Sequence, residues 1–217
     1  MHQHFAANTA GRDFVVGDVH GCFTQLQAQL ASLEFDPEVD RLFSVGDLVD
    51  RGAESELAYE WLSKPWFHAV RGNHEQMAID CADGLFDFAC YTANGGAWFL
   101  ALTKPEQRLI ADAFGSLPIT IDVDTPDGLV GIVHADCPLY SWPELLKALE
   151  GASGEQYAQM CIWSRERVQV GNTTNVEGVH SVIVGHTPMK ASKWLGNVRY
   201  IDTGAVFGHQ LTIIRIN

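Results

Sequence analysis

Six short apolar runs in this chain of 217 residues are followed at once by Asp, His or Asn, usually beside glycine. Runs of this length that are rich in β-branched residues are typical of buried strands. In α/β sheets, ligands bind at the carboxyl ends of the strands, and glycine permits the tight loops that this position needs. The pattern therefore predicts a single site built from six loops. The loops cover residues 17–21, 46–52, 71–75, 134–136, 185–187 and 202–204.

The order of the strand and helix patterns predicts an α/β fold (α+β layers), with alternation in the first half and mostly strands in the second. Phe23, Leu26 and Leu30 keep helical spacing, and Thr103 and Ser141 each begin a capping box with an early proline. The length fits a single domain, residues 1–217, with a helical insertion around residues 76–117. We expect strands at residues 14–16, 42–45, 67–70, 119–123, 129–133, 181–184, 198–201 and 211–216.

The net charge of −13 argues against nucleic acids and anionic membranes as partners. No apolar run approaches the roughly 20 residues of a membrane helix. The five cysteines include no CxxC pair, which argues against a disulfide framework or a zinc ribbon and favours a reducing, cytoplasmic location. The first residues lack the features of a signal peptide, and we expect His2 and His4 to lie in a mobile tail.

The donors in the six loops are carboxylates, imidazoles and an amide, without a thiolate. This set suits Mn²⁺ or Fe²⁺, and also Zn²⁺, and contains too many histidines for a Mg²⁺ or Ca²⁺ site. Six ligands exceed the need of one tetrahedral ion, so we expect two ions that share a carboxylate. Such a pair is a clamp for in-line attack on phosphorus. The candidate ligands are Asp18, His20, Asp47, Asn73, His134 and His186.

Other residues of the same loops fit phosphate chemistry. Arg51 and Arg71 flank two ligand loops and are suited to hold phosphate oxygens. His74 follows a candidate ligand and is suited to protonate a leaving oxygen, with Asp50 orienting its imidazole. The chain contains no GxxxxGK[ST], GxSxG or HExxH motif, so a P-loop, a serine-hydrolase elbow and a zincin helix are excluded.

In these residues the chain resembles the calcineurin-like metallophosphoesterase superfamily, whose opening blocks are GD-x-H-G, GD-x-x-D-R-G and GN-H-E. They stand here at residues 17–21, 46–52 and 72–75. Within the superfamily, the chain resembles the small bacterial and phage serine/threonine protein phosphatases, the group of the bacteriophage lambda enzyme. That match includes the His-Ala-Asp of residues 134–136 and the Trp-Ser-Arg of residues 163–165. It departs from the family at Ala53, where proline is usual.

The resemblance implies a central β-sandwich flanked by helices, with a dinuclear metal site at the carboxyl ends of the strands. By position, Asp18, His20 and a bridging Asp47 would hold the first ion. Asn73, His134 and His186 would complete the second. A metal-bridging hydroxide would attack phosphorus directly, without a phosphoenzyme. The phosphate would be bound by Arg51, Arg71 and Arg165, and the leaving group would be served by the His74–Asp50 pair.

The implied activity is removal of phosphate from phosphoserine and phosphothreonine in proteins, with phosphotyrosine as a further candidate and the preference between them left open. The implied partners are phosphoproteins or phosphopeptides, and the implied cofactors are two divalent ions, with Mn²⁺ preferred over Fe²⁺ or Zn²⁺. The alternative is a symmetrical diadenosine tetraphosphate hydrolase, a group that typically has glutamine at the position of His20 and no acid at that of Asp50. A lesser alternative is a non-catalytic metal-binding regulatory module. Segments 78–103 and 137–180 are candidates for setting specificity.

Overall fold

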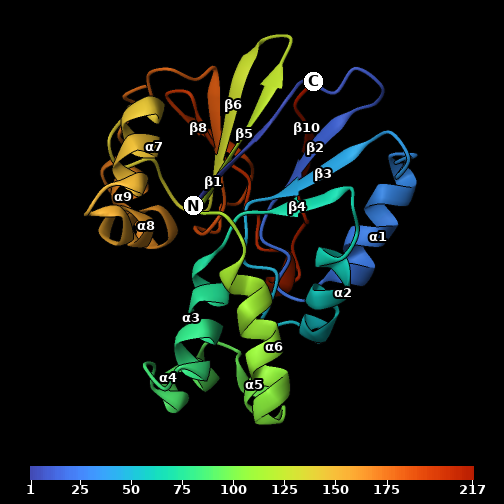
Figure 1. Cartoon of the computed structure of the whole chain (residues 1–217). Coiled ribbons are helices and arrows are strands. Elements are labelled where there is room, and N and C mark those ends of the chain that lie inside the picture. Colours follow the sequence, from blue (N-terminus) through green and yellow to red (C-terminus); the bar gives the residue numbers. More distant parts are fainter.

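Two β-sheets form the centre of the computed structural model, which describes residues 1–217 (Figure 1). The smaller sheet has the strand order β10-β2-β3-β4. β2 is parallel to β3 and antiparallel to β10, and β3 is parallel to β4. Three of its carboxyl ends therefore point the same way. The strands are β2 (Asp13–Val16), β3 (Arg41–Ser44), β4 (Phe67–Ala69) and β10 (Ile213–Arg215).

The larger sheet has the order β1-β5-β6-β7-β9-β8. The β1–β5, β6–β7 and β7–β9 pairs are parallel, whereas β5–β6 and β8–β9 are antiparallel. The parallel run of β6, β7 and β9 again places three carboxyl ends at one edge. The strands are β1 (His2–Phe5), β5 (Thr120–Thr125), β6 (Gly128–Val133), β7 (Ser181–Val184), β8 (Lys193–Leu195) and β9 (Val198–Tyr200).

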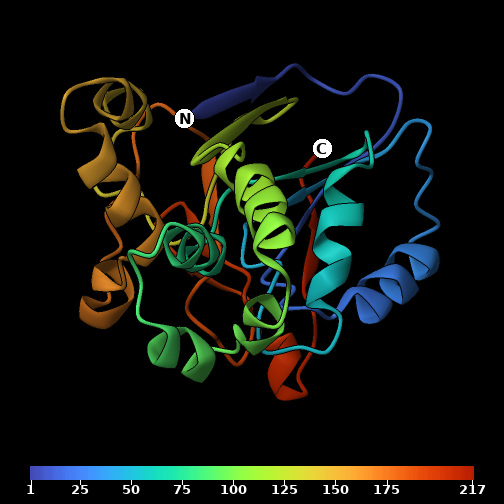
Figure 2. The same ribbon diagram turned by 60° about the horizontal axis from the view of Figure 1, so that its bottom comes forward.

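Helices cover both outer faces of the pair of sheets. In Figure 1, α1 and α2 lie beside the smaller sheet, α7 to α9 lie beside the larger sheet, and α3 to α6 gather at one end. Figure 2 shows this last group in front of the sheets, between the other two. The helices are α1 (Phe23–Ser32), α2 (Ala58–Leu62), α3 (Asn73–Ala82), α4 (Phe88–Ala93), α5 (Ala97–Leu100), α6 (Lys104–Gly115), α7 (Trp142–Glu150), α8 (Gly154–Trp163) and α9 (Glu166–Val170), with 3-10 turns at Ser55–Leu57 and Ala205–Phe207.

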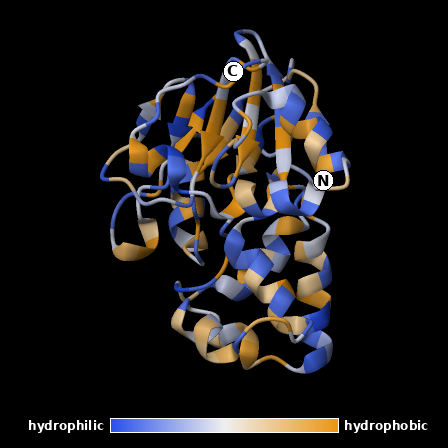
Figure 3. Ribbon diagram, turned by 90° about the vertical axis from the view of Figure 1, so that its left-hand side faces the viewer, coloured by the Kyte–Doolittle hydropathy of each residue, from blue (hydrophilic) through white to orange (hydrophobic).

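Three apolar clusters fill the spaces between these layers. One lies between the sheets and joins Val15 and Phe43 of the smaller sheet to Ile121 and Ile132 of the larger. The second packs the smaller sheet against its helices, and the third packs the larger sheet against α7 and α8. The central strands are largely orange in Figure 3, as expected for strands that are covered on both faces. Burial of these faces supplies the main stabilisation.

The predicted α/β class and the β-sandwich flanked by helices are confirmed, and each of the eight predicted strands overlaps an observed one. The prediction of a mobile tail is wrong, because His2 and His4 belong to β1, which pairs in parallel with β5. His4 Nδ1 lies 2.6 Å from an Asp122 carboxylate oxygen, and Phe5 packs edge-on against Phe43. The predicted helix start at Thr103 is present as a capping box with Glu106.

Four helices, α3 to α6, occupy most of the stretch expected to be a helical insertion. That this stretch is an insertion into a single domain stays a prediction. None of the helices has both the length and the apolar character that crossing a bilayer would require.

Candidate metal and phosphate site

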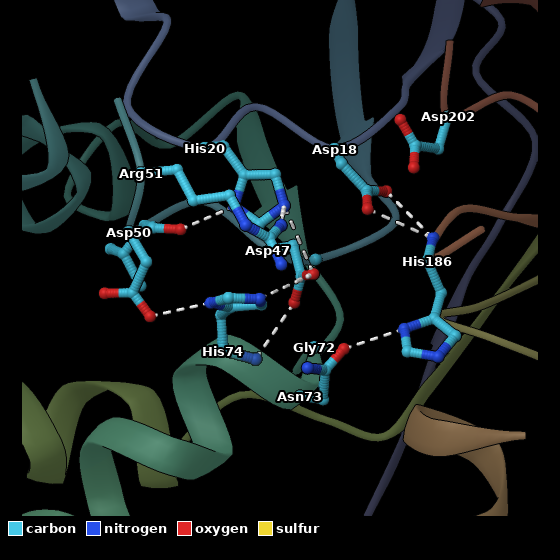
Figure 4. Close-up of polar contacts among 12 residues, drawn as sticks. Asp18, His20, Asp47, Asp50, Arg51, Gly72, Asn73, His74, His186 and Asp202 are labelled. Carbon is cyan, nitrogen blue, oxygen red and sulfur yellow. Dashed lines mark hydrogen bonds and ion pairs between the residues drawn. The ribbon is translucent and has the colours of Figure 1, made fainter. Parts of the chain in front are cut away.

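The loops that follow β2, β3, β4, β6 and β7 converge at the carboxyl ends of these strands, and Figure 4 shows several of their side chains close together. The loops after β2 and β3 carry Asp18, His20 and Asp47, and α3 begins at Asn73 directly after β4. The larger sheet contributes His134 after β6 and His186 after β7. The predicted candidate ligands thus come from both sheets, and all six are buried.

The backbone of these loops is in an unusual conformation. His20, Asp47, Asp50, Arg51 and His186 all have φ between +43° and +70°, a region that side chains other than glycine rarely adopt. Five of the seven such non-glycine residues in the chain are in this site. The loops also approach closely: a Cβ at position 185 would stand 1.9 Å from an Asp18 carboxylate oxygen, so glycine is required there.

One group of donors surrounds the Asp47 carboxylate on the side of the larger sheet. Ligand atoms of Asp47, His134 and His186 all lie within 4.8 Å of one another. The amide oxygen of Asn73 lies 3.0 Å from His134 Nε2 and 2.8 Å from His186 Nδ1. The structure therefore gathers all the residues expected to hold the second ion, together with the expected bridging carboxylate.

A second group lies on the other side of Asp47, and its members are Asp47, His20 and His74. His20 Nε2 is 3.5 Å from an Asp47 oxygen, and His74 Nε2 is 3.9 Å from the same oxygen. Asp18, expected as a ligand of the first ion, is outside this group. Both of its oxygens accept the backbone N–H of His186, each at 3.1 Å.

Each of the three candidate histidine ligands is oriented by a backbone carbonyl. Nδ1 of His20 lies 2.7 Å from the Val49 oxygen, Nδ1 of His134 lies 2.7 Å from the Val45 oxygen, and Nε2 of His186 lies 3.2 Å from the Trp163 oxygen. A ring nitrogen that donates to a carbonyl leaves the lone pair on the other nitrogen, the usual arrangement for a metal-binding histidine. Burial lowers the pKa of His20 and of His186 to about 3, so both rings are neutral.

The carboxylates add strong negative potential at the same place. Burial, reinforced by Asp202 and Asp47, raises the pKa of Asp18 well above its ordinary value. Burial alone would also raise the pKa of Asp47, but the surrounding histidines, His134 foremost, hold it well below the usual range. Burial by itself would lower the pKa of His134, but the same carboxylate raises it above its ordinary value. Imidazoles, an amide and crowded buried carboxylates without a thiolate are a donor set that fits divalent cations.

His74 and Asp50 form a buried pair beside the metal-ligand groups. His74 Nδ1 lies 2.7 Å from an Asp50 oxygen, and the two side chains are 1% and 0% exposed. The backbone N–H of His74 donates to Asp47 at 3.0 Å, which fixes the start of α3 against the shared carboxylate. Because Nδ1 is engaged by Asp50, Nε2 is the nitrogen of His74 that faces the site.

The predicted phosphate-binding arginines are placed differently from one another. Arg51 Nη1 contacts His20 Nε2, and its guanidinium lies 5.8 Å from the Phe207 ring, so it faces the candidate metal site. Arg71 instead donates to Gln76 and to the Gly115 and Leu117 carbonyls at the end of α6. Only its Nε, which is buried, lacks a partner. A phosphate-binding role for Arg71 remains a prediction.

Arg165 is the free arginine of the Trp-Ser-Arg block. It is exposed at the start of α9 and makes no side-chain hydrogen bond. Burial is the main cause of the lowered pKa of His186, and the positive charge of the nearby Arg165 lowers that pKa further. Arg167, two residues later, is fully buried and donates to Asp136 at 2.8 Å and to the Thr174 carbonyl at 2.7 Å. Of the two, Arg165 has the guanidinium available for a ligand.

Sequence reasoning assigned no role to four polar residues that support the site. Glu75 is 0% exposed and accepts the backbone N–H groups of Asp47, Leu48 and Gly72. Asp202, in the sixth of the predicted loops, adds a buried carboxylate near Asp18, although it was not among the candidate ligands. The other two, Tyr91 and Trp98, contact Asp50 from α4 and α5, and no local motif marks them.

Comparison with known proteins supplies relatives that include phosphatases and tetraphosphatases. A family profile for calcineurin-like phosphoesterases matches residues 14–211. Serine/threonine-protein phosphatase 1 of Salmonella typhimurium is 39% identical over 222 residues, which cover 100% of this chain and 97% of the relative. The symmetrical bis(5′-nucleosyl)-tetraphosphatase of Actinobacillus succinogenes is also 39% identical, but over 74 residues, 33% of this chain and 27% of that protein.

Among solved structures, the cold-active protein-tyrosine phosphatase of a psychrophilic Shewanella species aligns with a TM-score of 0.67. The alignment covers 100% of this chain and 78% of the other, at 15% sequence identity. At that identity the likeness concerns the fold: the two proteins share the pair of sheets and their helical layers.

Proposed function

Because this chain belongs to the calcineurin-like phosphoesterase family, we propose that it is a divalent-metal-dependent protein phosphatase that hydrolyses phosphoserine and phosphothreonine, and also phosphotyrosine, in proteins. The observation that carries the proposal is the extent of the match. Identity to the bacterial serine/threonine phosphatase runs over the whole chain, whereas identity to the symmetrical tetraphosphatase covers only a third of it.

The geometry of the His74–Asp50 pair supports the same choice. A phosphoserine ester has a poor leaving group, so its hydrolysis needs a proton at the departing oxygen. His74 Nε2 faces the site while Asp50 holds Nδ1 at 2.7 Å, an arrangement suited to an acid at that oxygen. In the proposed reaction the oxygen of water bonds to phosphorus and the bond from phosphorus to the serine oxygen breaks. The serine oxygen takes a proton from His74, and a proton released by the attacking water returns to His74.

We assign two divalent ions to the site, with Mn²⁺ preferred and Fe²⁺ or Zn²⁺ as the alternatives. When bound, such a pair supplies an activated water and neutralises charge on the phosphoryl group. Asp47 is the proposed shared ligand, with Asp18 and His20 on one side and Asn73, His134 and His186 on the other. Arg51 is the cation best placed to bind a phosphoryl oxygen, and Arg165 and Arg71 are assigned the same role with less support from their contacts.

The test is a parallel turnover assay after exhaustive chelation and after addition of Mn²⁺. The substrates are phosphoserine, phosphothreonine and phosphotyrosine peptides of one sequence, and diadenosine tetraphosphate. Asp47→Asn serves as the variant that is expected to be inactive, because it alters the proposed shared metal ligand. Asp127→Asn is its matched control, because Asp127 is exposed on the turn between β5 and β6.

We expect Mn²⁺-dependent phosphate release from the peptides, little cleavage of the dinucleotide, and loss of activity in Asp47→Asn alone. Preference for diadenosine tetraphosphate would overturn the substrate assignment and favour the tetraphosphatase. Full activity in protein shown to be free of metal would overturn the metal-dependent reaction. Absence of activity toward every phosphoester, with metal bound, would favour a regulatory metal-binding module.

A further inference from the structure

Two of the three side chains that hold Asp50 come from the helical segment α4–α5, far from it in sequence. One oxygen of the Asp50 carboxylate accepts from Nε1 of Trp98 at 2.7 Å and from the hydroxyl of Tyr91 at 3.2 Å. The other oxygen lies 2.7 Å from Nδ1 of His74. Asp50 is 0% exposed, so these three groups, and not water, decide how its carboxylate is turned.

From this arrangement we infer that Trp98 and Tyr91 are positioning residues for leaving-group protonation, which makes the α4–α5 segment a working part of the active site. The inference rests on the proposed phosphatase function, in which the His74–Asp50 pair serves the leaving group. Trp98 and Tyr91 act only through Asp50 and need not touch the substrate.

The physical argument begins with the carboxylate itself. Rotation about the terminal bond of an aspartate side chain is soft, so a single hydrogen bond leaves the plane of the carboxylate loosely defined. Two donors on one oxygen fix that plane and leave the second oxygen aimed at His74. A fixed acceptor in turn sets the plane of the imidazole and the direction of its Nε2, and small errors in such a direction are costly in catalysis.

Both donors are suited to hold their positions. Tyr91 is fully buried, and its ring packs edge-on against Phe99. Burial, together with the Asp50 carboxylate, raises the pKa of Tyr91 above its ordinary value, so the phenol keeps its proton as a donor. Trp98 is half-buried, and an indole N–H can only donate. Both residues therefore act as donors to the Asp50 carboxylate.

The backbone of the segment is docked on the same loop. Gly95, between α4 and α5, has φ of +99°, and a Cβ there would stand 2.2 Å from the backbone nitrogen of Arg51. Asp50 and Arg51 themselves have φ of +70° and +68°. Contact with Gly95 therefore supports a loop whose conformation is costly by itself. This loop carries both the orienting carboxylate and the arginine proposed to bind phosphate.

The test uses Trp98→Phe and Tyr91→Phe, which remove a donor and keep an aromatic ring. Trp66→Phe and Tyr59→Phe are the matched controls, because neither side chain makes a hydrogen bond and both lie away from the site. Each variant is made in the wild-type chain and in Asp50→Asn. The values of kcat and KM are measured on p-nitrophenyl phosphate and on phenyl phosphate, whose leaving group is poorer. Thermal midpoints identify variants that fail to fold.

We expect Trp98→Phe to lower kcat on phenyl phosphate about 10-fold and on p-nitrophenyl phosphate about 2-fold, with KM unchanged, because a good leaving group needs less protonation. Tyr91→Phe should show the same pattern more weakly. In the Asp50→Asn background both effects should vanish, since the residues act through Asp50. The controls should match the wild type on both substrates.

Two contrary outcomes are distinguishable. If Asp50→Asn is selectively impaired on phenyl phosphate but Trp98→Phe and Tyr91→Phe are not, the inference is wrong and the proposed function stands. If Asp50→Asn itself loses equal activity on both substrates, the proton-donor assignment of the proposed function fails and the inference fails with it. Losses that persist undiminished in the Asp50→Asn background would show a general structural role and would also overturn the inference.

Discussion

The buried pair of Arg167 and Asp136 offers a quantitative test of the packing beside the site. Arg167 is 0% exposed and donates from Nε to Asp136 at 2.8 Å. It also lies 4.9 Å from the Tyr140 ring and donates to the Thr174 carbonyl at 2.7 Å, while one Nη remains without a partner. The pair ties the loop after β6, which carries His134, to the start of α9.

The magnitude follows from burial. Asp136→Ala leaves a guanidinium uncompensated in an interior that water does not reach, and removal of one partner of such a pair costs about 3–5 kcal/mol of unfolding free energy. Arg167→Met should cost less, because Asp136 still accepts the backbone N–H of Cys137 at 2.8 Å. In the double variant no unpaired charge remains. The double-mutant cycle should therefore give a coupling energy of about 2–3 kcal/mol.

The control is the pair of Arg108 and Asp83, which has the same chemistry at the surface. Its N–O distance is 2.6 Å, but its side chains are 45% and 41% exposed. Exposed pairs of this kind contribute roughly 0.2–1 kcal/mol. Urea unfolding of both cycles, with the metal content held constant, measures the two coupling energies side by side. A coupling energy for Arg167 and Asp136 no larger than that of the surface pair would refute the argument from burial.

Three further outcomes are expected. Glu75→Ala should weaken Mn²⁺ binding by about 10-fold in calorimetry, because three backbone N–H groups, including that of Asp47, lose the carboxylate that holds them; unchanged affinity would contradict this role. Burial lowers the pKa of His68 from 6.5 to about 4, so the unfolded chain binds the proton first and stability falls as pH drops through that window. His68→Leu should remove about 1–2 kcal/mol of that pH dependence in urea titrations, and an unaltered dependence would show that another group is responsible. Saturating Mn²⁺ should raise the unfolding midpoint of chelated protein, since a ligand of the folded state alone stabilises it, whereas an unmoved midpoint would mean that the folded chain binds no ion.

The sequence was informative where the fold repeats a local rule. Asp18, Asp47 and His186 could be placed in one site because each follows a buried strand, and the carboxyl ends of such strands share an edge. The strands themselves were recognisable because both faces are covered, which makes them apolar throughout. β1 lacks that signature: its polar residues are held by pairing with β5 and by contact with Asp122, neither of which is local.

The destinations of long polar side chains were not predictable for the same reason. Arg71 stands beside a ligand loop in sequence, yet its guanidinium reaches the Gly115 and Leu117 carbonyls more than 40 residues later. Trp98 donates to Asp50 across 48 residues. A motif describes neighbours along the chain, whereas these contacts depend on how α3, α5 and α6 pack, which is decided by apolar residues elsewhere.

The first and last strands of the chain each join the sheet that is formed mainly by the opposite part of the sequence. β1 lies at the edge of the sheet built from residues 120–200, while β10 lies at the edge of the sheet built from residues 13–69. During synthesis on a ribosome, β1 would wait for β5 with its edge unpaired, and the early sheet would stay one strand short until β10 emerged. Pulling the two ends apart in a force experiment would load both edges in series, so the molecule should resist until one edge pairing shears. Cutting the chain between the two sheets would therefore leave each fragment without one edge strand of its own sheet.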